Sequence, residues 1–169
     1  KKQTIAGKFI VGIDPAKTHH QAAIIDANGT QLGKSFSVPV TSDGYTVVLW
    51  KNIGKYLGLC NSDNLVFAVE TSCNLWQTIA YYLHSQGYTV AMVSPLSTYH
   101  ERPILNHDFS RTDPKDAFHI AALAQRGSFD LYEHFPPHSN AMHTLSIAYD
   151  KLRKNLAQKN EPYYAYLTV

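Results

Sequence analysis

Hydrophobic and polar residues alternate along residues 8–14, a stretch that ends in Asp14. This period of two predicts a β-strand with one buried face. A second apolar run at residues 21–26 leads into Asn28-Gly29, a strong hairpin signal, and residues 31–38 can return as a third strand. The N-terminal part of the chain therefore predicts an antiparallel three-stranded meander.

Strand and helix patterns alternate in the following segment. Residues 65–70 form a continuous apolar run, which is typical of a strand buried on both faces, and residues 88–93 form another. The first predicted helix is capped by Ser42 or Asp43 and has apolar residues at Val47, Val48, Trp50, Ile53 and Leu57. The second is capped by Thr71 or Ser72, has apolar residues at Leu75, Ile79 and Leu83, and ends at Gly87. A third, short helix is predicted after Pro95, with an interruption at Arg102-Pro103. The fourth is an Ala-rich helix over residues 113–126, with Pro114 near its start and Gly127 past its end.

This order of elements predicts an α/β fold, a mixed five-stranded sheet with helices on both faces. Phe135-Pro136-Pro137 marks a boundary, so we expect one domain over residues 8–135 and a helical tail over residues 139–169. A heptad-like spacing in the tail predicts a helix that pairs with another chain or packs on its own domain. Its apolar positions are Met142, Leu145, Tyr149, Leu152 and Leu156.

The composition fits a folded domain, with 44% hydrophobic and 17% charged residues among 169. No apolar run approaches the roughly 18 residues of a membrane span, and no leader marks the chain for secretion. Two cysteines form neither a disulfide framework nor a metal-ligand spacing. We therefore expect a cytoplasmic protein with no membrane partner. The missing initial methionine predicts a processed product or a fragment.

Two carboxylates end apolar strands, Asp14 after the first and Glu70 after the strand that follows the meander. The preceding residue on the same face is small in both cases, Gly12 or Ala68, which predicts open space beside each carboxylate. A charge in such a place is costly unless it is paired, hydrated or bound to a cation. Each residue also has an ordinary explanation, because Asp14-Pro15 can form a turn and Glu70 can precede a helix N-terminus.

Asp113 and Asp116 share one face of the predicted helix, at positions i and i+3. Taken alone, the pair can be a capping box. Together with Asp14 and Glu70, however, the pair predicts an oxygen-rich site suited to Mg²⁺ or Mn²⁺. Two such ions about 4 Å apart suit phosphodiester chemistry.

Three spaced motifs carry these acids: Gly12-Ile13-Asp14, Val69-Glu70-Thr71 and Thr112-Asp113-Pro114-Lys115-Asp116-Ala117. In this order they resemble the DEDD transposases of insertion sequences, the "one-ten" group that includes the Piv-type DNA invertases. The resemblance covers about residues 9–132 and implies a RuvC-like, ribonuclease-H-like fold. It also implies a transposase or site-specific recombinase with two-metal chemistry, in which the catalytic and metal-binding residues are Asp14, Glu70, Asp113 and Asp116.

The same resemblance implies partners and a further domain. The family acts on DNA, with a structured guide RNA, as a dimer or a larger assembly, and the tail is the expected dimer contact. A C-terminal domain that supplies a nucleophilic serine follows the helical segment in this family. We expect that domain beyond Val169, so the chain corresponds to the metal-binding half and is expected to be incomplete for full activity.

Basic residues flank the proposed acidic site in sequence, and they can contact phosphates or form a solvated rim. They are Lys17, Arg102, Arg111, Lys115 and Arg126. The formal net charge is only +2, but 15 basic residues against 13 acidic ones become 15 against 9, or +6, if four carboxylates turn inward. The sequence therefore predicts a basic exterior around an acidic pocket.

Histidines suggest a zinc site, but their spacing does not support one. His19-His20 would point to opposite faces of a strand, and we expect the histidines to be surface or nucleic-acid-facing residues, as also for His107 and His119. His119 lies one helical step from Asp116 and can support the proposed metal site indirectly.

Two other functions remain open from the sequence. The domain can be a self-sufficient RuvC-like nuclease, such as a Holliday-junction nuclease. It can also be an inactive nucleic-acid-binding or dimerisation module. Divalent-metal binding separates the inactive module from both enzymes, and DNA cleavage by this chain alone would favour the nuclease.

Overall fold

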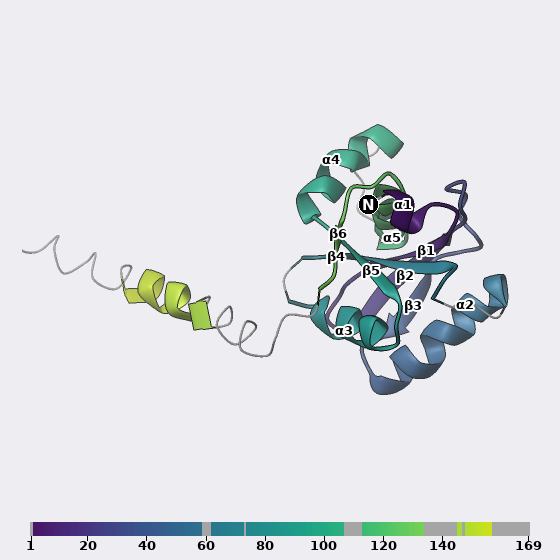
Figure 1. Cartoon of the computed structure of the whole chain (residues 1–169). Helices are drawn as coiled ribbons and strands as arrows, with labels where there is room; N and C mark the ends of the chain where they lie inside the picture. The colour runs from purple at the N-terminus through teal and green to yellow at the C-terminus, as the bar shows by residue number, and fades with distance from the viewer. Residues whose placement is uncertain are drawn as a thin grey trace, which may run out of the picture. The chain divides into compact units, whose positions relative to one another are not determined.

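The computed structural model describes residues 2–58, 62–72, 74–106, 113–133, 145–146 and 148–156, with only the backbone described at residues 2, 101–106, 113 and 114. A six-stranded sheet in the order β3-β2-β1-β4-β5-β6 forms its centre (Figure 1). The strands are β1 (Phe9–Asp14), β2 (His19–Ile25), β3 (Phe36–Pro39), β4 (Leu65–Glu70), β5 (Thr89–Val93) and β6 (Asp130–Leu131). Strands β1, β4 and β5 are parallel neighbours, whereas β2, β3 and β6 pair antiparallel.

Helices cover both faces of this sheet, with α5 on one face and α2 and α3 on the other (Figure 1). The helical elements are α1 (Lys2–Ile5), η1 (Gly44–Val48), α2 (Leu49–Leu57), α3 (Gln77–Ser85), α4 (Pro95–Asn106) and α5 (Asp113–Gln125). The predicted α/β class, a mixed sheet between helices, is confirmed, but the prediction of five strands missed the two-residue β6. Within the described ranges, none of the helices has the length and hydrophobicity to cross a membrane.

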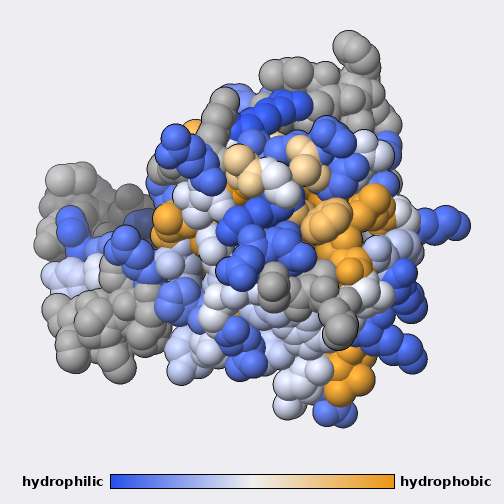
Figure 2. Space-filling view, turned by 45° about the vertical axis from the view of Figure 1, so that its right-hand side comes forward, coloured by the Kyte–Doolittle hydropathy of each residue, from blue (hydrophilic) through white to orange (hydrophobic). Residues whose placement is uncertain are grey.

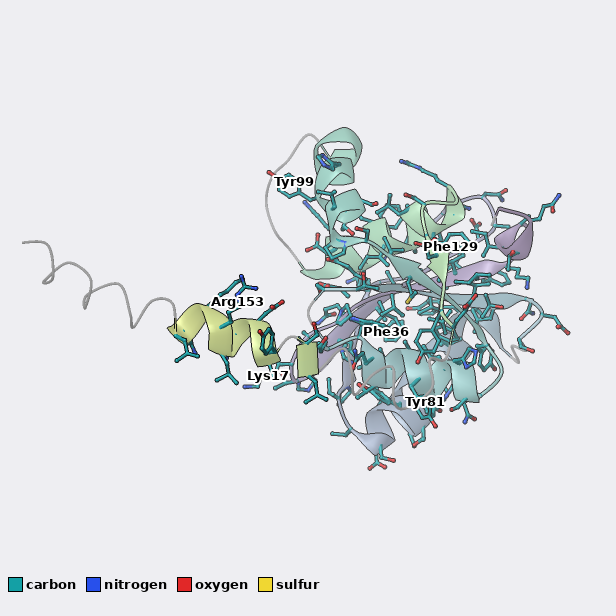
Figure 3. The ribbon with its side chains drawn as sticks, turned by 60° about the vertical axis from the view of Figure 1, so that its left-hand side comes forward. Lys17, Phe36, Tyr81, Tyr99, Phe129 and Arg153 are labelled. Carbon is teal, nitrogen blue, oxygen red and sulfur yellow. The ribbon has the colours of Figure 1, made fainter. Side chains whose placement is uncertain are left out.

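Two hydrophobic cores lie on opposite faces of the sheet. Val11 and Ile13 of β1 pack with the α2 and α3 core, whereas Ile10 packs with the α5 core. Figure 3 shows the same division, with Phe129 on the side of α5 and Tyr81 on the side of α3. Because neighbouring strand residues point to opposite faces, every second residue of β1 and β4 faces α5.

The meander differs from its prediction in its third strand. Only Phe36–Pro39 forms β3, and Gln31 makes an isolated bridge to Ile25. Gly33 interrupts the returning strand with a φ of +70°, a backbone conformation that glycine adopts at little cost. The Asn28-Gly29 turn itself is present, with Gly29 at a φ of +85°.

The helix starts also differ from the predicted caps. A π-helical turn, η1, precedes α2 and buries Tyr45, while Val47, a predicted core residue, is 56% exposed. Asp43 makes no capping side-chain bond, since the hydroxyl of Thr41 accepts the bond from the backbone N–H of Gly44. Helix α3 starts at Gln77, after the predicted caps.

Helix α4 runs from Pro95 to Asn106 without the interruption predicted at Arg102-Pro103. A proline inside a helix removes one backbone hydrogen bond but does not always end the helix. Helix α5 agrees with its prediction, because Pro114 is its second residue and Gly127, with a φ of +89°, follows its end.

Exposed hydrophobic side chains on the first part of the chain are spread over several elements. Figure 2 shows hydrophobic groups lying between hydrophilic ones on the face that it presents. Such scattered exposure is ordinary for folded domains. Examples that are 44% to 65% exposed are Val47, Tyr56, Tyr81, Leu96 and Tyr99.

The chain divides into two compact units, residues 1–132 and 133–169. In the second unit, residues 145–146 and 148–156 are helical, as predicted for the tail. Of the predicted heptad positions, Met142 lies outside the described residues. The other four are each between 61% and 66% exposed: Leu145, Tyr149, Leu152 and Leu156.

Candidate functional site

Asp14 and Glu70 end neighbouring parallel strands. Ile13 of β1 pairs with Val69 of β4, so the next residue of each strand, Asp14 and Glu70, lies at the same edge of the sheet. Ile10 and Val66 belong to the α5 core, and alternation along each strand places Asp14 and Glu70 on that same face. The two carboxylates therefore share one edge and one face.

Helix α5 crosses this face in close contact with β1. A Cβ atom added to Gly12 would collide with the carbonyl oxygen of Ala117 and lie 2.7 Å from the backbone nitrogen of Ala121. The prediction of open space beside Asp14 at Gly12 is therefore wrong, because the helix backbone occupies it. Glycine is required here for a close approach of helix and strand.

The far end of α5 fixes its direction. The side-chain amide of Gln125 donates to the carbonyl oxygens of Asp26 (3.3 Å) and Ala27 (2.9 Å). Asp26 follows Ile25, the partner of Ile10 near the start of β1. Helix α5 therefore runs antiparallel to β1, and its first turn, with Asp113 and Asp116, lies toward the edge where Asp14 and Glu70 stand.

The described carboxylates are largely shielded from solvent. Glu70 and Asp116 are each 8% exposed, and Asp14 is half-buried. Asp113 is the first residue of α5, and its side chain is outside the described part. Within the side chains that are described, no group of three His, Cys, Asp or Glu residues is gathered closely enough to hold a metal ion. The donor set is nonetheless all carboxylate oxygen, the chemistry that Mg²⁺ and Mn²⁺ prefer.

Hydrogen bonds fix the chain where it leaves β4 and β5. The backbone N–H of Thr71, directly after Glu70, donates to the carbonyl oxygen of Val93 at 2.9 Å. The hydroxyl of Thr98, which is 1% exposed, donates to the carbonyl oxygen of Ser94 at 3.3 Å. The end of β4, which carries Glu70, is therefore held to the end of β5 by a backbone hydrogen bond.

A buried chain of hydrogen bonds centred on His20 holds the loop after Asp14. The backbone N–H of Ala16 donates to Nδ1 of His20 (3.1 Å), so the ring proton is on Nε2, which donates to the hydroxyl of Tyr45 (2.9 Å). The Tyr45 hydroxyl is also hydrogen-bonded to Oγ1 of Thr78 on α3 (3.0 Å). This network connects the loop after Asp14 with the helix that follows the Glu70 strand.

The surface interpretation of the histidines is wrong for two of them. His20 has no exposed surface and His119 is 1% exposed, whereas His19 is exposed, so the two adjacent histidines do point to opposite sides. His107 lies outside the described residues. The alternation of β2 could have predicted the burial of His20, since His20 shares a face with Ala22 and Ile24.

The buried environment of His20 predicts a pH-dependent stability. Burial lowers the pKa of His20 from 6.5 to about 4, so the unfolded chain takes up a proton first as the pH falls. This residue should therefore lower the free energy of unfolding by about 2 kcal/mol between pH 7 and pH 5, with a plateau below pH 4. Urea unfolding at both pH values, with wild type and His20→Gln, measures the effect. An equal loss in both proteins would contradict it.

The predicted phosphate-contacting residues lie on several different elements of the chain. Lys17 is exposed in the loop after β1 (labelled in Figure 3), and Lys115 is exposed on α5 next to Asp116. Arg102 lies in α4, where only the backbone is described, and Arg111 lies outside the described residues. Lys17 and Lys115 therefore flank the carboxylate edge from two elements. A pocket lined by Lys115 and by Lys34 was not predicted from the sequence.

Three solved structures are similar to part of this chain. RuvC from T. thermophilus in complex with a Holliday junction substrate is 13% identical with a TM-score of 0.48, covering 74% of this chain and 99% of that one. Another Thermus thermophilus RuvC structure is 15% identical with a TM-score of 0.46, covering 73% and 99%. A polyphosphate/ATP-glucomannokinase from Arthrobacter is 16% identical with a TM-score of 0.39, covering 57% and 47%. Likenesses at this level do not identify a function.

The family is identified by a different comparison. The comparison with curated proteins finds no match. A family model described as "Transposase", that of the DEDD transposases of the IS110 type, matches residues 11–168. The match includes both strand-end acids and both acids of α5. The chain therefore belongs to the DEDD transposase family of the IS110 type.

Proposed function

We propose that Asp14, Glu70, Asp113 and Asp116 form the metal-dependent catalytic centre of this transposase and act on DNA phosphodiesters. The observation that supports this most directly is the placement of two strand-end acids at one edge and one face of the sheet, with the first turn of α5 directed toward that edge. The nearly buried positions of Glu70 and Asp116 add to it, because a cation bound by these carboxylates would be shielded from bulk water.

The chain's own residues would bind and orient the reacting groups. The acids of β1 and β4 stand on rigid strands, and those of α5 stand on a helix packed against Gly12 without intervening side chains. When bound, one or two Mg²⁺ or Mn²⁺ ions would stabilise charge on the phosphate and lower the pKa of an attacking hydroxyl or water. Rigid supports favour catalysis because the ligands then need little rearrangement in the transition state.

The finer assignments of domains and partners belong to the same proposal. We assign residues 8–135 to the RuvC-like catalytic domain and residues 139–169 to a helical linker. DNA is the proposed substrate and a structured guide RNA the proposed partner, as the family resemblance implies. The exposed apolar stripe of Leu145, Tyr149, Leu152 and Leu156 supports a homodimer or larger assembly through the tail.

Binding of Mn²⁺ tests the proposed centre directly. Calorimetric titration of the chain with MnCl₂ should show binding that Asp116→Asn weakens at least about tenfold, because one oxygen donor loses its charge. Asp43→Asn removes an exposed carboxylate with no capping bond and should leave the binding unchanged. Equal binding by both variants, or none by wild type, would contradict the metal centre and favour an inactive binding module.

A further inference from the structure

A pocket of about 610 Å³ lies between α5 and the segment that connects β2 with β3. The connecting segment contributes Gln31, Gly33, Lys34 and Ser35 to its wall. Helix α5 contributes Lys115, Phe118 and His119. The two walls are about 80 residues apart in sequence, so only the tertiary fold creates this groove, which we call the α5 groove.

The α5 groove adjoins the carboxylate edge. Lys115 directly precedes Asp116, and His119 follows it by one helical turn. On the other wall, Ser35 leads into Phe36, which pairs with Ala22 of β2, one residue from the partner of Asp14. The groove therefore lies next to Asp116 of the proposed metal centre.

The wall formed by the connecting segment is already ordered. The side-chain amide of Gln31 donates to the carbonyl oxygen of Gly33 at 3.2 Å and contacts Oγ of Ser35 at 3.5 Å. Gly33 packs so closely on the ring of Tyr56 that an added Cβ would collide with it. A preformed wall lowers the conformational entropy lost when a ligand binds.

The lining chemistry suits a phosphodiester backbone. Lys34 and Lys115 are exposed and stand on opposite walls, and none of the described lining residues is acidic. Ammonium groups bind phosphates by charge, and a half-buried aromatic ring such as Phe118 can contact a sugar or a base. This is the reverse of the carboxylate edge, which repels phosphate unless cations are present.

We infer that the α5 groove binds the DNA backbone next to the phosphate held at the carboxylate edge, with Lys34 as the contact contributed by the connecting segment. The inference rests on the proposed function, because the carboxylate edge determines which part of the DNA lies beside the groove. Lys34 is a binding residue in this assignment and takes no part in the chemical step.

Salt-dependent binding of DNA by the full chain tests the groove. Fluorescence anisotropy with a labelled DNA oligonucleotide, without divalent metal, should show affinity about fivefold lower for Lys34→Gln at low salt. The slope of log affinity against log salt should fall by about 1, as expected when one phosphate contact is lost. Lys34→Arg should restore both values, because it keeps the charge.

The controls separate this inference from the proposed function. Lys51→Gln removes an exposed lysine of α2 that does not line the groove, and it should bind DNA as wild type does. An equal effect of Lys51→Gln and Lys34→Gln would overturn the groove, and so would an effect confined to RNA of the same sequence. Lys34→Gln should keep wild-type Mn²⁺ binding. The DNA-binding measurements can therefore contradict the groove while Mn²⁺ binding still supports the metal centre, and the Mn²⁺ titration can contradict the metal centre while DNA binding still supports the groove.

Discussion

Replacement of Glu70 by glutamine should lower metal-dependent DNA cleavage or strand exchange by the transposase at least about a thousandfold, or roughly 4 kcal/mol of transition-state stabilisation. Glutamine keeps the shape of the side chain but removes the negative charge that a divalent ion requires. Glu70 is 8% exposed at the end of β4, so water could not easily replace the carboxylate oxygen that we propose binds the metal. Product formation with supercoiled substrate in Mg²⁺ measures the loss.

Binding and folding serve as controls for Glu70→Gln. The variant should retain DNA binding at low salt, since the proposed phosphate contacts lie on other residues, and it should unfold no earlier than wild type in EDTA. Asp43→Asn, at an exposed carboxylate, should keep wild-type activity. Activity of Glu70→Gln within about fivefold of wild type would show that this acid is not part of the catalytic centre.

Replacement of Gly12 by alanine should lower the free energy of unfolding by about 3 kcal/mol or more. The added methyl group would meet the carbonyl oxygen of Ala117 and the backbone nitrogen of Ala121, and backbone atoms cannot turn aside as a flexible side chain can. Helix α5 would have to move away from β1, which would also separate Asp116 from Asp14. Thermal unfolding should show a midpoint about 6 to 12 °C lower.

Gly54→Ala is the matched control for this substitution. Gly54 lies inside α2, and an added Cβ would meet no side chain and no neighbouring segment within 4 Å. Alanine is a better helix former than glycine, so this variant should be as stable as wild type or up to about 1 kcal/mol more stable. A midpoint for Gly12→Ala within 2 °C or so of wild type would contradict the close packing of α5 on β1.

Local patterns in the sequence predicted the elements that carry the acids. Alternation along β1, the continuous apolar run of β4 and the Pro114 and Gly127 boundaries of α5 all report on one segment at a time. Each depends on the spacing of side chains along a strand or helix, which the sequence contains directly. The order of these elements then predicted a mixed sheet between helices, and the same spacing made the four acids candidates for one site.

Contacts between distant segments could not be predicted in this way. The two-residue β6 is too short to leave a pattern, and Gly33 ends a strand that alternation alone would continue. Val47, one of the apolar positions that predicted the helix, is exposed and Tyr45 is buried, because a π-helical turn changes the angle between successive side chains. These differences have one origin, since each depends on the space that neighbouring segments fill in the folded domain and not on the spacing of side chains within a segment.

The identity, order and periodicity of the elements can be read from residue spacing along the chain, and with them the acids that end β1 and β4 and begin α5. Three contacts emerge only from the folded chain: α5 packs on Gly12, His20 bonds to Tyr45, and Lys34 shares a groove with Lys115. The periodicity of a segment reflects interactions within that segment. Packing expresses excluded volume and hydrogen bonding between segments, which depend on the relative positions of chains far apart in sequence.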